Sequence, residues 1–400
     1  MTMNILIISC VFPPEPVVSA KLSHDIAVSL SEKGDVVTVV SPKPTRPYKF
    51  KFELSETNNN FEHIILDSYT CPQSNIAGRL IESYSFGKKC SKYIRENRNK
   101  IDKIYLNSWP LFSQYFIVKE AKKHNIPSIV HVMDIYPESL TNKISIGSGL
   151  VQKTLLPIDK YILRNTEKVI CISENMKQHL SQSRDLPVSK LHIVHNWQDE
   201  ESFITFKNNN LTANNDEMPF TFMYLGNNGP VAGVEFLIQS FVDANIKNSQ
   251  LIVAGGGSRT EACKKLADRL GATNVKFILV PDGKVPEIQS KADVMLLPVK
   301  KGGAMSSIPS KLPAYMFSAK PIIGSLDEIS DTAKAIIDAD CGIVVSPENK
   351  NELIAAMRNI SVWAKSVLEE KGENGFNYAM KYFSRSRNLE KLIRIVKAGK

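Results

Sequence analysis

The sequence predicts an α/β fold made of two doubly wound domains, each built around a parallel sheet. Short apolar runs alternate with helical patterns along most of the 400 residues, as expected when parallel strands are covered by helices on both faces. The alternation stops in an asparagine-rich stretch at 199–219 and then resumes. A chain of this length is also too long for one ordinary core. We therefore predict a first domain at 1–199, a linker or long loop, and a second domain at 219–375.

The first half begins with a continuous apolar run and then repeats the strand–helix pattern. The expected strands are residues 5–8, 36–40, 103–106, 128–132 and 168–172. A helix with Leu22, Ile26 and Leu30 on one face follows the first strand and is closed by Gly34. Another helix is expected around 112–123, so the first half predicts one complete doubly wound sheet.

The second half repeats the pattern with a second set of strands. These are residues 220–224, 251–254, 275–277, 294–297, 322–323 and 342–345. An apolar stripe through Leu389, Leu392 and Val396 defines the last helix, near 376–400, which we expect to pack back on the first domain. Ligands in such sheets bind outside the carboxyl ends of the strands. Two sheets facing each other would therefore share a cleft.

The composition favours a cytoplasmic protein with an anionic partner. The formal net charge is +9, but no nucleic-acid-binding module accompanies it, so anionic small molecules or a membrane surface are better partners than nucleic acid. No apolar run is long enough to span a membrane, and the first ten residues lack the basic leader of a signal peptide. The six scattered cysteines form no CxxC pair and are expected to be reduced and buried.

Several common nucleotide and metal signatures are missing. No glycine precedes Gly34, so no GxGxxG follows the first strand, and the chain has no GxxxxGK[ST] motif. The missing motif therefore argues against a dinucleotide-dependent oxidoreductase. The trio Asp338-Ala339-Asp340 resembles a metal-binding DxD, but it ends a helix away from the glycine-rich loops, and we interpret it as surface charge. We expect no metal and no cofactor, and no residue stands out as a covalent nucleophile.

The stretch at 302–325 carries the strongest candidate for an anion site. It follows the apolar strand at 294–297, and a helix begins near Ser310, whose side chain is suited to capping it. Lys311 then lies in the first turn, where the helix dipole disfavours a cation. A bound anion, such as the diphosphate of a nucleotide-sugar, would explain the lysine. The alternative is a solvent-exposed lysine on an ordinary helix.

Two glycine-rich loops follow the first two strands of the second domain. The first contains Gly226, Asn227, Asn228 and Gly229, and the second contains Gly256. Glycines at these places let backbone amides approach a phosphate closely, although each loop alone is equally consistent with a plain tight turn. Both loops and the helix start at Ser310 follow strands of the same sheet, so we expect them to meet at one edge.

In the first domain, the segment HVMDIYPES follows the strand at 128–132. His131, Asp134 and Glu138 lie in or just beyond the end of that strand, where an imidazole or a carboxylate could orient a sugar hydroxyl or transfer a proton. The alternative is that His131 is a packed strand residue and Asp134 caps a helix. We interpret Ser173 and Glu174, in the next such segment, as helix-capping residues.

Residues 75–100 combine basic and apolar side chains. The basic ones include Arg79, Lys88, Lys92 and Arg95. A basic amphipathic helix of this kind can lie on an anionic membrane leaflet. The alternative is a solvated helix face.

Taken together and in this order, the motifs resemble those of the GT-B glycosyltransferases of glycosyltransferase family 4. The branch acting in bacterial capsule, O-antigen and colanic-acid synthesis is the most similar. The matching pieces include VFPPEPVVSAKLSHDIAVSLSEKGD, HVMDIYPESL, VICISENM, IVHNWQD, YLGNNGPVAGVEFLI, ADVMLLPV, IPSKLPAYMFSAKPII and CGIVVSPENKNELIAAM. The resemblance implies a GT-B fold, with two Rossmann-like domains facing across a cleft.

The resemblance also implies roles for particular residues. The diphosphate-sugar donor is expected on the second domain, held by Gly226, Asn227, Asn228, Gly229, Gly256, Leu279, Ser306, Ser310 and Lys311. Asp134, Lys311 and His131 are the expected catalytic residues. The acceptor is expected on the first domain, near Pro14, Glu15 and Glu138. Two glutamates that many family members carry eight positions apart are replaced by Ser306 and Ala314.

The function implied by the resemblance is metal-independent sugar transfer with retention at the anomeric carbon. The donor would be a UDP-sugar of hexosyl or N-acetylhexosaminyl type, and the acceptor a saccharide or polyprenyl-linked saccharide. The enzyme would be cytoplasmic or peripheral on the inner face of the cell membrane. Two alternatives stay open: a non-catalytic nucleotide-sugar-binding subunit, which Ser306 and Ala314 favour, and a GT-B sugar-nucleotide epimerase.

Overall fold

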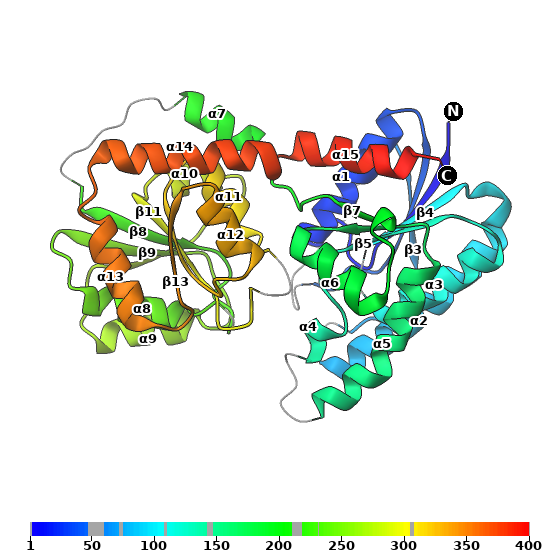
Figure 1. Cartoon of the computed structure of the whole chain (residues 1–400), viewed down its shortest axis with the longest axis horizontal. Coiled ribbons are helices and arrows are strands. Elements are labelled where there is room, and N and C mark those ends of the chain that lie inside the picture. Colours follow the sequence, from blue (N-terminus) through cyan, green and yellow to red (C-terminus); the bar gives the residue numbers. More distant parts are fainter. Residues whose placement is uncertain are drawn as a thin grey trace. The chain divides into compact units, whose positions relative to one another are not determined.

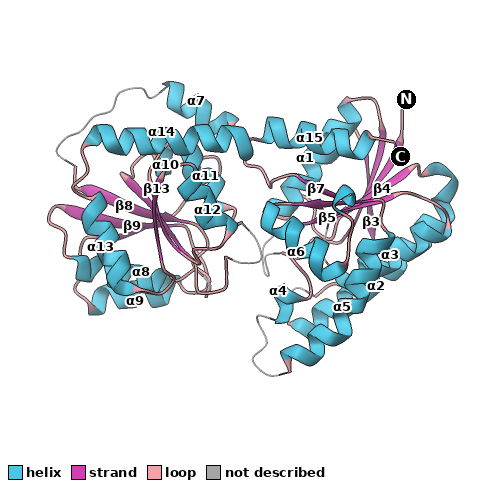
Figure 2. Cartoon of the chain, in the orientation of Figure 1, coloured by secondary structure: helices cyan, strands magenta, loops and turns pink. Residues whose placement is uncertain are grey.

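The computed structural model describes residues 2–46, 60–71, 75–107, 110–141, 147–209, 218–230, 232–304 and 308–399. The chain forms two compact units. The first unit contains Met1–Asn196 and takes back the end of the chain, Asn388–Lys400, while the second contains Trp197–Arg387. Each unit has an all-parallel sheet between helices (Figure 2), so the predicted fold class of two Rossmann-like α/β domains is confirmed.

The first unit has a seven-stranded sheet in the order β3-β2-β1-β4-β5-β6-β7. Its strands are β1 Asn4–Ile8, β2 Val36–Pro42, β3 Glu62–Leu66, β4 Lys103–Asn107, β5 Ser128–Val132, β6 Lys168–Cys171 and β7 Leu191–Ile193. The sequence pattern missed β3 and β7, which form the two edges of the sheet. β7 has only three residues, and β3 is not fully buried at any position, so neither has the continuous buried apolar run of a central strand.

Helices cover both faces of this sheet (Figure 1). They are α1 Val18–Glu32, α2 Ile76–Asn97, α3 Leu111–Lys123, α4 Glu138–Thr141, α5 Ser148–Asn165, α6 Glu174–Arg184 and α15 Arg385–Lys397. Ser173 accepts a hydrogen bond from the Met176 amide at 3.1 Å and caps α6, as predicted. The core on the side of α2 and α3 includes Phe86, Ile117 and Val130.

Two lysines of the first sheet bind the carbonyl groups at the carboxyl end of the last helix, α15. Lys103 is 3% exposed, and its ammonium donates to the carbonyls of Val396 at 2.9 Å and Ala398 at 3.1 Å. Lys168 donates to the carbonyls of Ile395 and Ala398. Cations are favoured at the carbonyl end of a helix, so β4 and β6 hold α15 by charge as well as by packing.

The second unit has a six-stranded sheet in the order β10-β9-β8-β11-β12-β13. Its strands are β8 Phe220–Leu225, β9 Ser249–Ala254, β10 Val275–Ile278, β11 Val294–Pro298, β12 Ile322–Ser325 and β13 Gly342–Val345. The chain passes from β8 to β9 and β10 on one side, then crosses to β11 on the other. The β8–β11 boundary is therefore the topological switch point, the place where ligands bind in doubly wound sheets.

Two sets of helices sandwich the second sheet (Figure 1). One face carries α8 Val234–Ala244, α9 Thr260–Arg269 and α13 Lys350–Ile360, whose apolar side chains share one core. The other carries α7 Glu201–Asn209, α10 Val285–Gln289, α11 Lys311–Phe317, α12 Asp331–Asp338 and α14 Lys365–Tyr382. The switch point lies between these two cores, with α11 on the second face.

The prediction of a structureless linker at 199–219 was wrong for its first part. Residues Glu201–Asn209 form α7, and Phe203 is 3% exposed. The Phe203 ring packs against Phe317 of α11, with ring centroids 5.8 Å apart. One aromatic anchor is enough to dock a short helix whose sequence has no clear period. Residues 210–217 of the same stretch lie outside the described residues.

The remaining expectations concern metal, membrane and cysteine. Asp340 forms an ion pair with Lys371 at 2.7 Å, in keeping with surface charge, and the described residues hold no cluster of three metal-ligating side chains. None of the helices in the described ranges is long and apolar enough to cross a bilayer. All six cysteines are buried and none is in a disulfide, as the sequence predicted.

We predict that Gly372→Ala in α14 lowers stability. Alanine alone would favour a helix by about 1 kcal/mol, but a Cβ at Gly372 would lie 2.0 Å from the carbonyl oxygen of Ala319, just beyond α11. The two segments must then separate, and we expect a net loss of about 1–3 kcal/mol in urea unfolding. Gly149→Ala in α5 is the control, because no described atom lies within 4 Å of its Cβ. Equal stability of the two variants would contradict the close packing.

Candidate functional site

The candidate donor site lies at the switch point of the second unit, where Lys311 meets the loop after β8. A Cβ built on Gly226 would lie 2.1 Å from Cε of Lys311. The lysine side chain therefore runs directly over the glycine, and a side chain at 226 would displace it. The structure brings together two segments 85 positions apart that the sequence had assigned to one anion site.

Lys311 is half-buried, and its ammonium has no anionic partner among the described residues. Its nitrogen lies 5.1 Å from the centre of the Tyr224 ring, which provides a weak cation–π contact. Burial lowers the pKa of Lys311, because removing water disfavours the charged form. Buried charges are normally paired. This ammonium is therefore placed to gain from an anionic ligand.

The predicted capping role of Ser310 was wrong. Ser310 has helical backbone angles, φ −60° and ψ −13°, and its side chain makes no capping hydrogen bond. An N-cap needs an extended backbone to turn its oxygen toward the first amides, whereas here the turn already begins at Pro309, whose carbonyl accepts from the Leu312 amide at 3.0 Å. Helix α11 has only seven residues, so the site rests on the lysine rather than on a long helix dipole.

The two glycine-rich loops are joined by backbone contacts. The amide of Asn228 donates to the carbonyl of Gly256 at 2.8 Å, and the carbonyl of Asn228 accepts from the Arg259 amide at 2.9 Å. The Asn228 side chain is fully buried and donates to the Thr260 hydroxyl at 3.1 Å. Its Oδ1 has no hydrogen-bond partner in the described part of the chain.

Glycine is required where these loops touch. Gly255 has φ +106°, and a Cβ there would lie 2.5 Å from the carbonyl oxygen of Gly226. A Cβ on Gly257, with φ +156°, would lie 2.4 Å from Oδ1 of Asn227. Each position combines a left-handed backbone with a close backbone approach, which only glycine allows at low cost. The glycines therefore hold the two loops together, and Gly256 between them is exposed.

The remaining predictions for the donor site concern Leu279, Ser306 and Ala314. Leu279 is 82% exposed in the loop after β10, an unusual setting for an apolar side chain of this size. Ala314 is 8% exposed and packs in the core beneath α11. Ser306 lies outside the described residues.

In the first unit, His131 is completely buried in β5. Its Nδ1 lies 2.7 Å from the Tyr105 hydroxyl, and burial lowers the pKa of His131 to about 3. The ring therefore stays neutral at ordinary pH. This placement favours the packed-strand interpretation over proton transfer. Asp134, two residues beyond the end of β5, is exposed.

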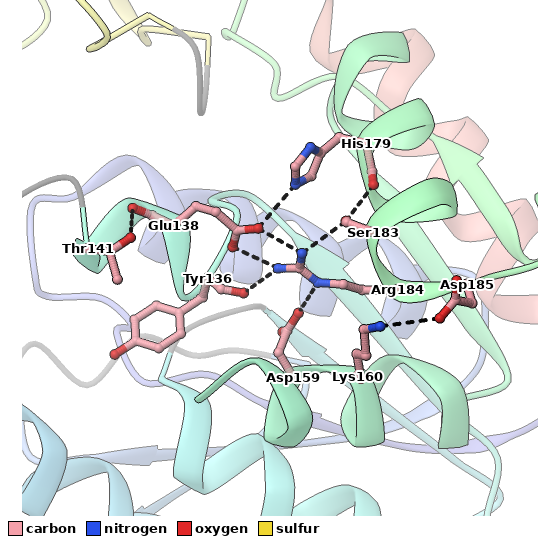
Figure 3. Close-up of polar contacts among 9 residues, drawn as sticks. All are labelled: Tyr136, Glu138, Thr141, Asp159, Lys160, His179, Ser183, Arg184 and Asp185. Carbon is pink, nitrogen blue, oxygen red and sulfur yellow. Dashed lines mark hydrogen bonds and ion pairs between the residues drawn. The ribbon is translucent and has the colours of Figure 1, made fainter. Parts of the chain in front are cut away.

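Glu138, predicted to contact the acceptor, is instead bound to a buried arginine (Figure 3). Its two carboxylate oxygens accept from Nη1 and Nη2 of Arg184, both at 2.7 Å, and His179 lies 3.1 Å from one of them. Burial alone would raise the pKa of Glu138, but hydrogen bonds from His179 and Arg184 lower it to about 2. The carboxylate is therefore fixed as an anion within the protein.

Arg184 ties three segments of the first unit together. Its Nε donates to Asp159 of α5 at 2.7 Å, and its Nη2 also donates to the carbonyl of Tyr136 at 2.9 Å. With Glu138, these contacts fix the segment that follows Asp134. The sequence analysis missed Arg184, although a signal existed. Met176, Leu180 and Arg184 share four-residue spacing, so the buried face of α6 ends in a charge that needs partners.

Glu15 is also occupied within the protein. It is 5% exposed, and Oε1 accepts from the amides of Thr45 and Arg46, both at 2.8 Å. Burial raises the pKa of Glu15, and these hydrogen bonds offset only part of that effect. The preceding Pro14 is half-buried. In this structure, Glu15 orders the loop after β2 rather than presenting its carboxylate to solvent.

Comparison with known proteins agrees with both units. Residues 20–202 match the family described as Glycosyltransferase Family 4, and residues 219–361 match that described as Glycosyl transferases group 1. A curated relative, the probable glycosyltransferase WbjE of Pseudomonas aeruginosa, is 21% identical over 384 residues. The match covers 91% of this chain and 87% of that protein.

Solved structures share the fold at low sequence identity. HepE of Anabaena in complex with UDP has a TM-score of 0.71 and 15% identity, covering 98% of this chain and 99% of that one. WaaG, a glycosyltransferase involved in lipopolysaccharide biosynthesis, has a TM-score of 0.69 and 16% identity, covering 99% of this chain and 100% of that one.

The two parallel-sheet units and these comparisons define a glycosyltransferase of the GT-B fold. More particularly, its first half is a glycosyltransferase family 4 domain, and its second half is a group 1 glycosyltransferase domain. The family predicted from the sequence motifs is therefore confirmed.

We predict that Arg184→Met strongly destabilises the first unit. The substitution leaves the buried Asp159 and the partly buried Glu138 without their cation, and breaking a buried ion pair in this way typically costs about 3–5 kcal/mol. Thermal or urea unfolding measures the loss. Arg394→Met is the matched control, because Arg394 pairs with Glu390 on the exposed surface of α15, where such pairs contribute about 0–1 kcal/mol. A loss at Arg184 no larger than that of the control would contradict the buried network.

Proposed function

We propose that this protein is a retaining glycosyltransferase that moves a hexosyl or N-acetylhexosaminyl group from a UDP-sugar. The acceptor is a saccharide or a polyprenyl-linked saccharide of a bacterial surface polysaccharide. The observation that carries the proposal is the half-buried Lys311 ammonium, which has no described carboxylate within ion-pair reach and lies against the glycine-rich loop at the switch point.

Lys311 and the loop amides would act on the leaving group of the reaction. When the bond to the sugar breaks, negative charge develops on the departing diphosphate, and fixed donors stabilise it without reorganisation. Lys311 offers a cation, while the loop at 226–229 and Ser310 offer further donors. In this scheme the protein's own groups stabilise the charge on the diphosphate, so the reaction is metal-independent. Leu279, exposed beyond β10, would lie against the base.

The acceptor would be bound by the first unit. Asp134 is exposed just beyond β5, and its carboxylate is suited to orienting a sugar hydroxyl near the reacting carbon. Glu138 and Glu15 support this surface indirectly, because both are engaged within the protein. Pro14, in the loop after β1, contributes apolar surface beside them.

Three similar proteins support the donor and the pathway class. HepE was solved in complex with UDP, which favours uridine as the base. WaaG is involved in lipopolysaccharide biosynthesis, and WbjE carries the name of a probable glycosyltransferase. These names agree with the branch of capsule, O-antigen and colanic-acid enzymes that the sequence motifs resemble.

The basic segment at 75–100 supports a peripheral place on the inner face of the cell membrane. In α2, Lys88, Lys89 and Lys92 are exposed beside Ile81 and Tyr84, which are 55% and 50% exposed. A helix face that mixes lysines with exposed apolar side chains is suited to an anionic leaflet. A polyprenyl-linked acceptor would be presented at the same surface.

We predict that Lys311→Ala weakens UDP binding at least tenfold while leaving the fold intact. The ammonium lies over the glycine loop, and a charge-assisted hydrogen bond is worth about 1.5–3 kcal/mol. Isothermal titration with UDP measures affinity, and circular dichroism checks folding. Lys264→Ala, which removes an exposed lysine of α9, is the control. If Lys311→Ala binds UDP as tightly as the parent, the donor site is misplaced.

The transferase and the non-catalytic binder are separated by slow hydrolysis of UDP-sugars. An active transferase without acceptor should release UDP from its preferred donor, and Asp134→Asn should reduce transfer far more than it reduces UDP affinity. Coupled UDP-release assays over a panel of UDP-sugars and GDP-sugars measure this. Binding without turnover, unaffected by Asp134→Asn, would favour the accessory subunit that Ala314 and Ser306 suggest. Interconversion of the sugar without release of UDP would favour an epimerase.

A further inference from the structure

The two central strands of the second unit separate before β8 ends. The paired positions of β8 and β11 are Phe222 with Val294 and Met223 with Met295. On its other side, β8 stays paired with β9 as far as Leu225. The carboxyl end of β8 therefore extends past its last partner on β11. This is the crevice at the switch point, and a buried backbone there needs other hydrogen-bond partners.

Tyr315 supplies those partners from α11. Its hydroxyl accepts a hydrogen bond from the Leu225 amide at 2.9 Å and donates one to the Leu225 carbonyl at 2.8 Å. The tyrosine is completely buried. One hydroxyl thus satisfies both the donor and the acceptor of a single residue, as a neighbouring strand would do.

The position of Tyr315 links the two halves of the candidate donor site. It lies four residues after Lys311 on α11, and Leu225 immediately precedes Gly226, the residue that Lys311 covers. A second tyrosine also holds the loop, because the Tyr224 hydroxyl donates to the Asn227 carbonyl at 2.8 Å. Tyr315 therefore connects the helix that carries Lys311 to the strand that leads into the loop at 226–229.

We propose that Tyr315 is a positioning residue for donor binding. Its hydroxyl takes the place of β11 beside Leu225 and thereby fixes the distance between the Lys311 ammonium and the loop at 226–229. The inference rests on the proposed donor site and adds to it a residue that touches no ligand. Without the hydroxyl, the Leu225 amide and carbonyl both lose their hydrogen-bond partner on this side of β8. The loop is then free to shift relative to the lysine.

Tyr315→Phe tests this role because it removes the hydroxyl and keeps the ring. We expect about tenfold weaker UDP binding by isothermal titration, in line with the loss of two hydrogen bonds, in a variant that remains folded. Thr221→Val is the matched control. It removes a buried hydroxyl at the opposite end of β8, where Thr221 donates to the Pro219 carbonyl and accepts from Gln250, and UDP affinity should be unchanged.

Combining the substitution with Lys311→Ala separates positioning from general stability. If Tyr315 acts through the lysine, the loss caused by Tyr315→Phe should largely disappear in the Lys311→Ala background. Two outcomes would overturn the inference alone: unchanged UDP affinity in Tyr315→Phe while Lys311→Ala binds weakly, or fully additive losses. Failure of the unsubstituted chain to bind UDP would overturn the donor site as well.

Hydrogen exchange in the unsubstituted chain gives a measurement that needs no variant. The Leu225 amide, bonded to the Tyr315 hydroxyl, should exchange slowly even without UDP, at a rate comparable to the Met223 amide in the paired part of β8. UDP should slow exchange of the amides at 226–229 further. Fast exchange at Leu225 would show that the hydroxyl does not hold the strand end, and would overturn the proposal even if Tyr315→Phe failed to fold.

Discussion

The partial burial of one cation, Lys311, at the end of a parallel sheet is the constraint around which the candidate donor site is arranged. Lys311 lies against Gly226 and over the Tyr224 ring, a setting that offers little compensation for the water the ammonium has lost. Several neighbouring features make room for this placement. Gly226 has no side chain, β11 turns away from β8 after Met295, and α11 begins at the lysine itself. An anionic ligand would complete the charge balance of the site.

Close contacts hold the segments of the candidate donor site together. Gly255 and Gly257 bring the second loop against the first, Asn228 bridges them, and Tyr315 holds the end of β8. These contacts involve backbone atoms or a single hydroxyl, so they tolerate little movement. Preorganised donors stabilise developing charge more effectively than mobile ones. The rigidity of the loops is therefore consistent with binding a diphosphate and stabilising it as it leaves.

The first unit uses buried ion pairs for a similar purpose. Arg184 binds Glu138, Asp159 and the carbonyl of Tyr136, and so fixes the chain that follows Asp134. Glu15 orders the loop at Thr45 and Arg46 by the same means. Carboxylates that looked like ligand-binding groups in the sequence are thus structural supports. Asp134 of the same segment is exposed at the surface.

The sequence by itself determined the α/β class, the two parallel sheets and the family, because these depend on local periodicity and on motifs kept in order. It also indicated that Lys311 and the glycine-rich loops share one edge of a sheet, since strand ends of a parallel sheet must meet there. Tertiary structure decided what each polar side chain contacts. Arg184 and Glu138 are 46 positions apart, and Tyr315 and Leu225 are 90 apart. No local pattern records such pairings, because folding alone brings their atoms within hydrogen-bond distance.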